Sequence, residues 1–282
     1  MHAVVVDASG APALAELPMP AGPGELVRVR ACGLCGSDVE KLTPANAGLV
    51  LGHEVVAETA GGRRVALVHH HACGECRQCL AGHESLCPSF SAPTIVPGGF
   101  AEHVAAQGWI ELPDEVDDAR GTMVEPLACV LRGARAVPPG RALIVGNGFI
   151  GHLFGALLRH RGDAVFAIDT DERRTGPEPD DLVDTVILAG RGGVETALEW
   201  ARSGGTILVF ADAGEIPAAP IYRRELTIVG VRSASPAVMR DALALLPHLE
   251  LPEPVTLPLA RFADGLELFR RRDALKVVFT TS

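Results

Sequence analysis

The stretch Ala142-Leu-Ile-Val-Gly146-Asn-Gly148-Phe-Ile-Gly151 decides the fold of the second half of this 282-residue chain. An apolar run leads directly into Gly-x-Gly-x-x-Gly and then into an apolar stretch that ends near Arg161, which predicts a strand, a glycine loop and a helix. Such a loop lets the backbone approach a pyrophosphate at the positive end of the helix. We therefore expect a dinucleotide site at Gly146, Asn147, Gly148, Phe149, Ile150 and Gly151.

Several charged residues follow the next apolar run, Ala164 to Ile168, and three of them are candidates for binding the dinucleotide. Asp169 lies at the offset of about 20 residues that is expected for a carboxylate binding the adenosine ribose hydroxyls. A 2′-phosphate would be repelled there, so NAD is favoured over NADP. Arg173 and Arg174 could instead attract that phosphate, or they could be a solvated helix end; we count both among the candidate cofactor-binding residues.

The second half of the chain alternates between strands and helices from the turn at Pro138 onward. The apolar runs Thr185 to Ala189 and Thr206 to Phe210 are typical of buried parallel strands, and Gly193 to Arg202 predicts a helix between them. The 13 residues of 170–182 cannot supply a crossover helix and a further strand. We expect a doubly wound parallel sheet trimmed to about five strands.

The first third of the chain has the short, closely spaced strand-like runs that are typical of a β-barrel. Ala3 to Val6, Glu25 to Arg30 and Arg64 to Val68 are short strand-like runs separated by glycine and proline. The tail from Val255 also contains strand-like segments, around a helix predicted at Phe262 to Arg271.

Four of the seven cysteines form the pattern Cys73-x2-Cys76-x2-Cys79-x7-Cys87. One tetrahedral zinc ion can bind four thiolates at such spacings, which predicts a structural zinc site. The alternative is a disulfide pair, but disulfide frameworks belong to short extracellular chains with small cores. This chain is 48% hydrophobic, and its start, Met1-His-Ala-Val, shows no basic region followed by an apolar run. We expect a cytoplasmic protein.

A second zinc site is predicted from Cys35 and from Gly52-His53-Glu54. Catalytic zinc usually takes three protein ligands and leaves one position open, and Cys35, His53 and either Glu54 or Glu125 would meet that need. A single buried cysteine or histidine is more often a core residue. The prediction therefore depends on the occurrence of these residues together with the dinucleotide loop.

Three polar residues in the segment that follows Cys35 have expected roles around this metal. Asp38 is expected to accept a hydrogen bond from His53, although it could be a turn residue. Ser37 is expected to take the proton from the alcohol, because a hydroxyl both donates and accepts. Glu40 could pass that proton to water, or be a solvated carboxylate. The triplet at 69–71, three histidines, is not expected to bind metal, because neighbours in a strand point to opposite faces.

The composition excludes some classes of partner. A net charge of −10 disfavours nucleic acid, whose phosphates require a basic face. No apolar stretch reaches the roughly 18 residues that suggest a membrane span. We expect a protein that acts on small molecules.

Taken together, these motifs resemble the zinc-containing medium-chain dehydrogenases, the alcohol, polyol and sugar dehydrogenases with a GroES-like catalytic domain. The resemblance covers nearly the whole chain. It includes Gly98-Gly-Phe-Ala-Glu102 and Glu125-Pro-Leu-Ala128, the latter similar to the sorbitol, threonine and glucose dehydrogenase branches. It implies a GroES-like β-barrel catalytic domain over 1–137 and 255–282, and a Rossmann domain over 138–254.

The same resemblance implies one catalytic and one structural zinc per chain, with Glu54 and Glu125 alternating as ligands or one of them holding the zinc-bound water. Glu40 stands where many relatives have histidine, which leaves the proton path open in detail. Relatives form dimers through the strand that corresponds to Leu226 to Gly230, so a homodimer or homotetramer is expected.

The expected activity is NAD-linked oxidation of a secondary alcohol in a polyol, sugar, cyclitol or similar small molecule. One alternative is an NAD(P)H-dependent carbonyl reductase in a biosynthetic pathway, because the direction depends on cellular ratios of cofactor and substrate. The other is a zinc-stabilised binding module that has lost dinucleotide binding. The presence of a complete set of catalytic metal residues disfavours the binding module.

Overall fold

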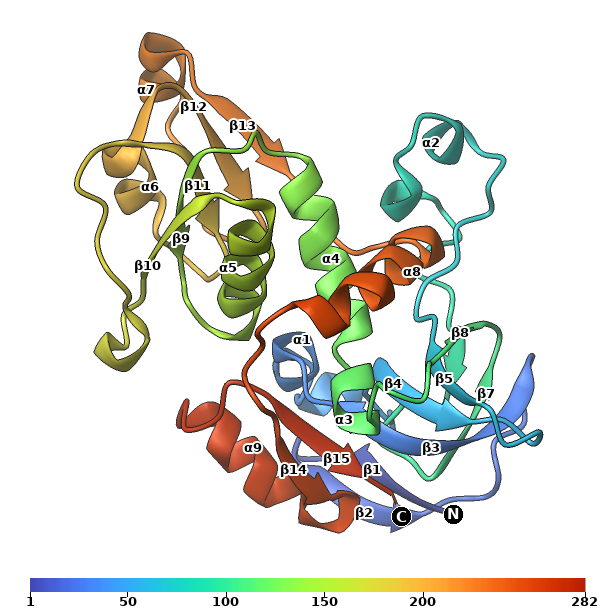
Figure 1. The fold of residues 1–282 in the computed structure, drawn as a ribbon. Coiled ribbons are helices and arrows are strands. Elements are labelled where there is room, and N and C mark those ends of the chain that lie inside the picture. Colours follow the sequence, from blue (N-terminus) through green and yellow to red (C-terminus); the bar gives the residue numbers. More distant parts are fainter. Residues whose placement is uncertain (282) are drawn as a thin grey trace. The chain divides into compact units, whose positions relative to one another are not determined.

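The computed structural model describes residues 1–281, which form two compact units (Figure 1). The first unit comprises Met1–Pro126, Ala234–Pro247 and Pro252–Ser282, and the second comprises Leu127–Ser233 and His248–Leu251. The helices are α1 (Gly36–Glu40), α2 (Arg77–Leu80), α3 (Asp118–Gly121), α4 (Val124–Arg135), α5 (Phe149–Arg161), α6 (Val194–Trp200), α7 (Ala218–Arg224), α8 (Pro236–Leu245) and α9 (Phe262–Arg270).

The first unit is built around an eight-stranded, mostly antiparallel sheet in which β3 (Glu25–Gly33) pairs with three other strands. This long strand pairs with β4 along one edge, with a register shift between Val29 and Ala31, and on its other edge with β7 over its first half and β15 over its last residues. The other strands of the sheet are β4 (Glu54–Glu58), β5 (Arg64–Leu67), β6 (Ile95–Val96), β7 (His103–Ala106), β8 (Trp109–Glu111), β14 (Val255–Pro258) and β15 (Val277–Thr280). A ribbon of β1 (His2–Val6) and β2 (Pro12–Glu16) lies beside it, bridged to the barrel at Ala101 and Val50.

Three phenylalanines from distant parts of the sequence form the centre of the barrel core. The ring centroids of Phe262 and Phe279 lie 4.5 Å apart, and Phe100 meets Phe262 edge-on at 4.9 Å. Phe279 is fully buried and belongs to β15, which pairs with β3. The last strand is therefore part of the barrel, as the sequence predicts for the tail.

The second unit is a five-stranded parallel sheet in the order β10-β9-β11-β12-β13. Its strands are β9 (Arg141–Val145), β10 (Ala164–Ile168), β11 (Val183–Leu188), β12 (Ala201–Val209) and β13 (Thr227–Gly230). Leu143 and Val186, in the middle strands, are fully buried, as continuous apolar runs in parallel sheets require. The predicted fold class, a GroES-like barrel with a trimmed Rossmann sheet, is confirmed.

One predicted helix end is wrong. The helix expected to reach Arg202 ends at Trp200, and Ala201 already begins β12. Ala201 pairs with Val183 of β11, so its backbone belongs to the sheet ladder.

The sheet is trimmed at its β10 edge. Sheets of this type commonly have the order 3-2-1-4-5-6, and the place of strand 3, outside β10, is taken here by a loop. This loop contains one 3-10 turn, Glu172–Arg174, and the Gly176 amide donates to the Ala167 carbonyl of β10 over 2.9 Å. An ion pair between Asp180 and Arg141 fixes the loop near the start of β9. The short connection therefore partly covers the edge that the missing strand would have paired.

The boundaries between the two units differ from those expected from the sequence, 137/138 and 254/255. The second unit begins at Leu127, and the chain first returns to the first unit at Ala234. Most of α4, from Leu127 onward, is part of the second unit, where Gly133 leaves room for the Phe154 ring of α5. Helix α8 is part of the first unit and contacts β8. The turn at Pro138 marks the start of the parallel sheet, but not the start of the compact unit.

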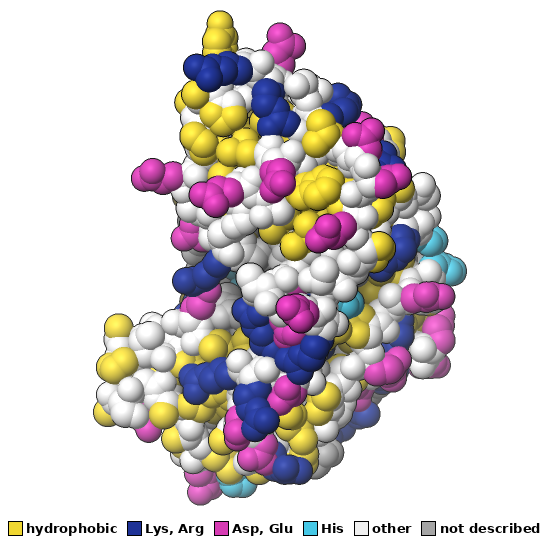
Figure 2. All heavy atoms as spheres, turned by 90° about the vertical axis from the view of Figure 1, so that its left-hand side faces the viewer, with side chains coloured by type: hydrophobic (Ala, Val, Ile, Leu, Met, Phe, Trp, Pro, Cys, Tyr) yellow, Lys and Arg dark blue, Asp and Glu magenta, His cyan; other side chains and the backbone are white. Residues whose placement is uncertain are grey.

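On the face drawn in Figure 2, hydrophobic side chains lie among basic and acidic ones. Mixed charge of this kind agrees with a chain that has 25 basic and 35 acidic residues. Among the described residues, no helix combines the length and the apolar character that crossing a bilayer demands.

Replacing Phe279 with alanine is expected to destabilise the first unit by about 3–5 kcal/mol, because it opens a cavity between two other rings. Phe279→Leu should cost much less, since it retains most of the buried volume. Denaturant unfolding of the zinc-loaded protein, followed for both variants, measures the two losses. Equal stability of the alanine and leucine variants would show that the ring cluster does not carry the core.

Candidate active site

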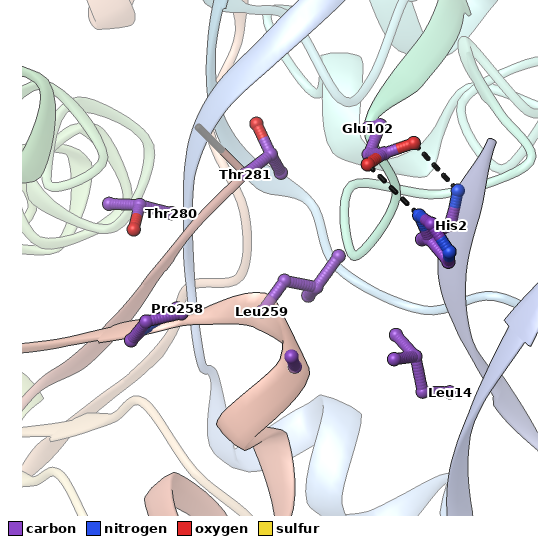
Figure 3. A pocket seen from close by; sticks show the side chains of 8 residues that line it. His2, Leu14, Glu102, Pro258, Leu259, Thr280 and Thr281 are labelled. Carbon is purple, nitrogen blue, oxygen red and sulfur yellow. Dashed lines mark hydrogen bonds and ion pairs between the residues drawn. The ribbon is translucent and has the colours of Figure 1, made fainter.

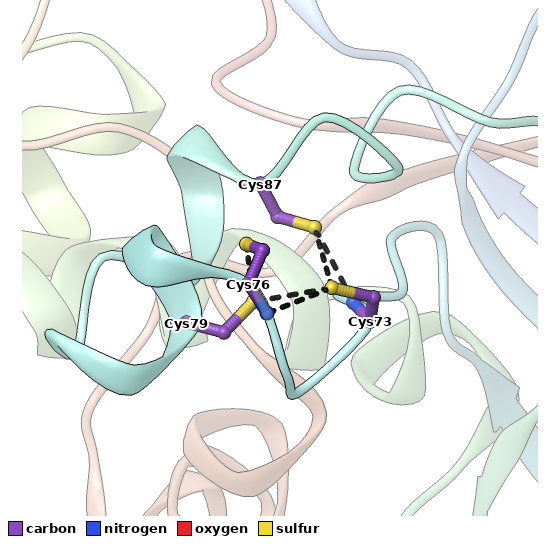
Figure 4. A group of neighbouring side chains, drawn as sticks. All are labelled: Cys73, Cys76, Cys79 and Cys87. Carbon is purple, nitrogen blue, oxygen red and sulfur yellow. Dashed lines mark hydrogen bonds between the residues drawn. The ribbon is translucent and has the colours of Figure 1, made fainter.

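The four predicted zinc cysteines converge in one lobe (Figure 4). The sulfur of Cys73 lies 3.5 Å from that of Cys87 and 3.9 Å from that of Cys79, and the Cys76 and Cys79 sulfurs are 3.5 Å apart. Four sulfurs bound tetrahedrally at about 2.3 Å from zinc would lie about 3.8 Å from one another. The observed spacing therefore fits a zinc ion without rearrangement.

Backbone hydrogen bonds favour the thiolate form of Cys87 in this lobe, whereas desolvation raises the pKa of Cys79 to about 12. The Cys73 amide donates to the Cys87 sulfur over 3.3 Å, and this hydrogen bond is the main reason why the pKa of Cys87 falls to about 6. Cys76 caps the N-terminus of α2, and the amide of Cys76 donates to the Cys73 sulfur over 3.4 Å. A thiolate is the form that binds a metal.

A second group of possible metal ligands brings together Cys35, His53 and Glu54. One ligand atom from each residue lies within 4.8 Å of the other two. Cys35 precedes α1 and His53 immediately precedes β4, so two chain segments that are distant in sequence supply the group. Thiolate, imidazole and carboxylate are all zinc donors, and three of them leave a fourth tetrahedral position open.

The buried carboxylate of Asp38 joins these two segments. One of its oxygens lies 3.2 Å from Nδ1 of His53 and accepts the Gly52 amide over 3.2 Å, and the other accepts the Cys35 amide over 3.1 Å. Burial is the largest single influence and lowers the pKa of His53, but the charges and hydrogen bonds of Asp38 and Cys35 together raise that pKa well above its usual value. The predicted Asp38–His53 hydrogen bond is present, and it directs Nε2 of His53 to the metal group.

Two polar side chains of α1 complete the surroundings of Cys35. The hydroxyl of Ser37 lies 3.3 Å from the Cys35 sulfur, next to the proposed metal position. Glu40, the last residue of α1, is exposed to solvent. Ser37 is therefore placed to meet a group bound at the metal, and Glu40 lies on the solvent side of the same helix.

Glu54 forms a buried ion pair with Lys276 that the sequence analysis missed. The ammonium of Lys276 also donates to the Leu34 carbonyl over 3.1 Å. A side chain at Gly33 would overlap both charged groups, so glycine is required there. A lysine directly before the apolar run of the last strand was the available signal, since buried lysines require a charged partner.

The structure separates the two candidate carboxylates. Glu125 lies in the first turn of α4 and outside the group formed by Cys35, His53 and Glu54 among the described residues. Glu54 is the carboxylate that lies within ligand distance of Cys35 and His53.

His69 is a second residue near this group that the sequence analysis missed. Its ring centroid lies 4.8 Å from that of His53. The three histidines at 69–71 are expected from the sequence to lie in a strand, but β5 ends at Leu67 and the histidines lie in a loop. Burial, followed by the charge of His53, lowers the pKa of His69 to about 2, so its ring is neutral. None of the three histidines belongs to a possible metal group in residues 1–281.

The dinucleotide loop has the geometry that its glycines predict. Gly146 has a φ of 94°, and a Cβ there would lie 2.8 Å from the Gly190 amide nitrogen. Gly148 caps the N-terminus of α5, which runs for 13 residues, so free amides point out of a long helix where a phosphate can bind. Phe149, Ile150 and Gly151 form the first turn of α5.

Asp169 and the arginines after it lie beside this loop. One oxygen of Asp169 accepts the Asn147 amide over 2.7 Å, and the Asn147 side chain donates to the Arg174 carbonyl over 2.6 Å. Arg173 binds Asp171 through two nitrogens, and this hydrogen bonding lowers the pKa of Asp171 to about 2. A Cβ on Gly148 would lie 3.7 Å from a guanidinium nitrogen of Arg174. Of the two arginines, Arg174 therefore reaches the glycine loop.

A separate pocket of about 300 Å³ in the first unit contains none of the predicted site residues (Figure 3). His2 crosses one side of it and binds Glu102 through both its amide and its ring. The remaining wall comes from Leu14, from Pro258 at the end of β14 and the 3-10 turn that follows it, and from Thr280 and Thr281 at the end of β15. Its position and lining do not connect it with the metal chemistry.

Comparison with known proteins supplies the family. Residues 22–114 match the family described as alcohol dehydrogenase GroES-like domain. The D-altritol 5-dehydrogenase of Agrobacterium fabrum (strain C58) is 31% identical over 87% of this chain and 88% of that protein. This chain belongs to the zinc-containing medium-chain dehydrogenase family. The predicted resemblance is confirmed.

Other members show the same relationship. The L-galactonate-5-dehydrogenase of Escherichia coli (strain K12) is 25% identical over 94% of each chain. The solved structure of an alcohol dehydrogenase from Thermus sp. ATN1 is 25% identical, with a TM-score of 0.84 over the whole of both chains. The protein is an oxidoreductase of the alcohol dehydrogenase type, and the family implies zinc and a nicotinamide dinucleotide as cofactors.

Cys79→Ser is expected to reduce the zinc content from two ions to one per chain, because three ligands cannot complete the lobe. Cys129→Ser is the matched control, since Cys129 belongs to neither metal group. Elemental analysis of the purified variants measures the ratio, and limited proteolysis should show new cleavage within 73–87. Retention of both zinc ions by Cys79→Ser would contradict a four-cysteine site.

Asp38→Asn is expected to weaken zinc binding at the Cys35–His53 group by roughly 10- to 100-fold, because His53 loses the charge that orients it. Competition with a chromogenic chelator measures this affinity. Asp264→Asn, in an exposed pair with Arg261, is the control and should change nothing. Unchanged affinity in Asp38→Asn would mean that the carboxylate only supports the loops.

Proposed function

We propose that this protein is a zinc-dependent dehydrogenase that oxidises a secondary alcohol of a polyol, sugar or sugar acid with NAD. The observation that carries the proposal is the group Cys35, His53 and Glu54, three zinc donors of different kinds held within 4.8 Å. A structural zinc site is usually closed by four ligands, whereas three suit a catalytic one. The names of the relatives, a D-altritol and an L-galactonate dehydrogenase, favour polyhydroxylated substrates.

Different groups would carry out the separate steps of alcohol oxidation. Zinc, when bound, supplies a Lewis acid that favours loss of the hydroxyl proton, and the nicotinamide accepts hydride. Ser37 takes that proton, since its hydroxyl lies 3.3 Å from Cys35 and can donate its own proton onward. Glu40, exposed at the end of the same helix, passes the proton to water.

Asp38 and Lys276 act as positioning residues in this proposal. Asp38 holds the His53 ring with Nε2 directed to the metal, and it fixes the backbone on both sides of the site. Glu54 is the third ligand, and Lys276 orients its carboxylate and balances its charge inside the barrel. Unpaired, the Glu54 carboxylate would be strongly disfavoured in so buried a position.

The second unit favours NAD as the dinucleotide. Asp169 follows β10 with its carboxylate against the glycine loop, where a 2′-phosphate would meet a negative charge. Arg174 lies over the same loop and offers a cation to the pyrophosphate. Two zinc ions and one NAD per chain are therefore the proposed complement, in a homodimer or homotetramer.

The test is to combine zinc analysis, dinucleotide calorimetry and a substrate screen on the same preparation. Protein with two zinc ions should bind NAD in the micromolar range, bind NADP more weakly, and reduce NAD with at least one polyol or sugar acid. Cys35→Ser should keep the structural zinc and the NAD affinity but lose the oxidation. Failure to bind either dinucleotide would instead support a zinc-stabilised binding module, and reaction only with carbonyl compounds would support a reductase.

A further inference from the structure

The imidazole of His69 lies beside one of the candidate metal ligands, His53. Its ring centroid lies 4.8 Å from that of His53, at a tilt of 30°. His69 is partly buried, yet its ring makes no hydrogen bond within residues 1–281 and its nitrogens are not enclosed by protein. A neutral imidazole offers one donor and one acceptor, and a ligand can reach them because the ring nitrogens are not enclosed by protein.

The surrounding loop holds this ring in place. The His70 ring lies 3.9 Å from the His69 ring and stacks on Phe90 at 4.2 Å. Nδ1 of His70 lies 2.7 Å from the Phe90 carbonyl oxygen, which anchors the stack to the backbone. The hydroxyl of Thr94 lies 2.8 Å from the Val68 carbonyl oxygen and 2.6 Å from that of His69. The position of His69 is thus fixed through both its backbone and its neighbouring ring.

His69 has the chemistry and the position to bind a second hydroxyl of the substrate. The proposed reacting carbon lies by Cys35 and His53, with Ser37 on the α1 side of the sulfur. Adjacent hydroxyls of a polyol are separated by about the distance of two hydrogen-bonded oxygens. One can therefore lie by His53 while the next meets the His69 ring beside it.

We propose that His69 is a substrate-binding residue that hydrogen-bonds the hydroxyl next to the reacting one, and that it gives the enzyme its preference for vicinal diols over simple secondary alcohols. This inference rests on the proposed dehydrogenase function and specifies its substrate class. A hydrogen bond of this kind adds binding energy for polyols that an alcohol with one hydroxyl cannot use.

The test compares 2,3-butanediol with 2-butanol in wild-type protein and in His69→Phe. Phenylalanine keeps a ring to pack against His53 and His70 but has no nitrogen. The kcat/KM for the diol should fall roughly 5- to 30-fold, mainly through KM, while that for 2-butanol changes less than about twofold. His69→Gln, which keeps a donor and an acceptor, should restore part of the diol preference. An equal loss for both alcohols, or no loss for either, would overturn the proposal.

A second measurement separates this role from metal binding and from the activity itself. The zinc content and chelator-competition affinity of His69→Phe should equal those of the wild type, and a tenfold loss would make His69 a metal ligand and overturn the proposal. In cobalt-substituted protein, titration with 2,3-butanediol should change the visible spectrum at lower concentration in the wild type than in His69→Phe.

The cobalt titration also distinguishes failure of the proposed dehydrogenase function from failure of the proposed role of His69. If the wild type oxidises neither these two alcohols nor any polyol or sugar acid of the screen with NAD or NADP, the proposed function fails, yet a weaker diol affinity in His69→Phe still supports His69 as a diol-binding residue. Equal diol affinity in the two proteins would overturn that role whether or not the enzyme is active.

Discussion

The buried carboxylate of Asp38 is the constraint on which the catalytic half of this protein depends. It binds the amides of Cys35 and Gly52 and the ring of His53, and thereby joins two segments that are separated along the chain. A buried carboxylate is costly unless its oxygens are satisfied, and three partners satisfy it here. The same contacts that make this charge tolerable also hold the thiol and the imidazole at the spacing of metal ligands.

Around this centre the barrel holds charged groups in compensating pairs. Lys276, the residue before the last strand, meets Glu54, and Gly33 leaves the space that both side chains occupy. The rings of His53, His69, His70 and Phe90 form a continuous series of ring contacts on another side. A metal ligand, its charge partner and a candidate substrate contact are therefore held by different elements of the barrel.

The second unit shows how little of a parallel sheet is needed to form the glycine loop. The loop follows β9, which pairs with β10 on one side and with β11 on the other, and Gly190 after β11 closely approaches Gly146. The absent outer strand is replaced by a loop that donates one hydrogen bond to β10 and is tied to Arg141. The loop also holds Arg174 over the glycines, so the shortening supplies a cation near the position where phosphates are expected.

The sequence by itself determined the fold class, the five-stranded sheet and both cysteine-containing motifs, because these depend on local spacing and on short apolar runs. It also predicted the hydrogen bond between Asp38 and His53, because a metal-binding imidazole needs a partner that orients it. Tertiary structure alone decided that Glu54, and not Glu125, lies with Cys35 and His53, that Lys276 pairs with Glu54, and that His69 lies against His53. The physical reason is the same in each case. These contacts join residues that are far apart in the chain, or depend on a loop leaving a strand at Leu67, and pairings of that kind leave no periodic signal in the sequence.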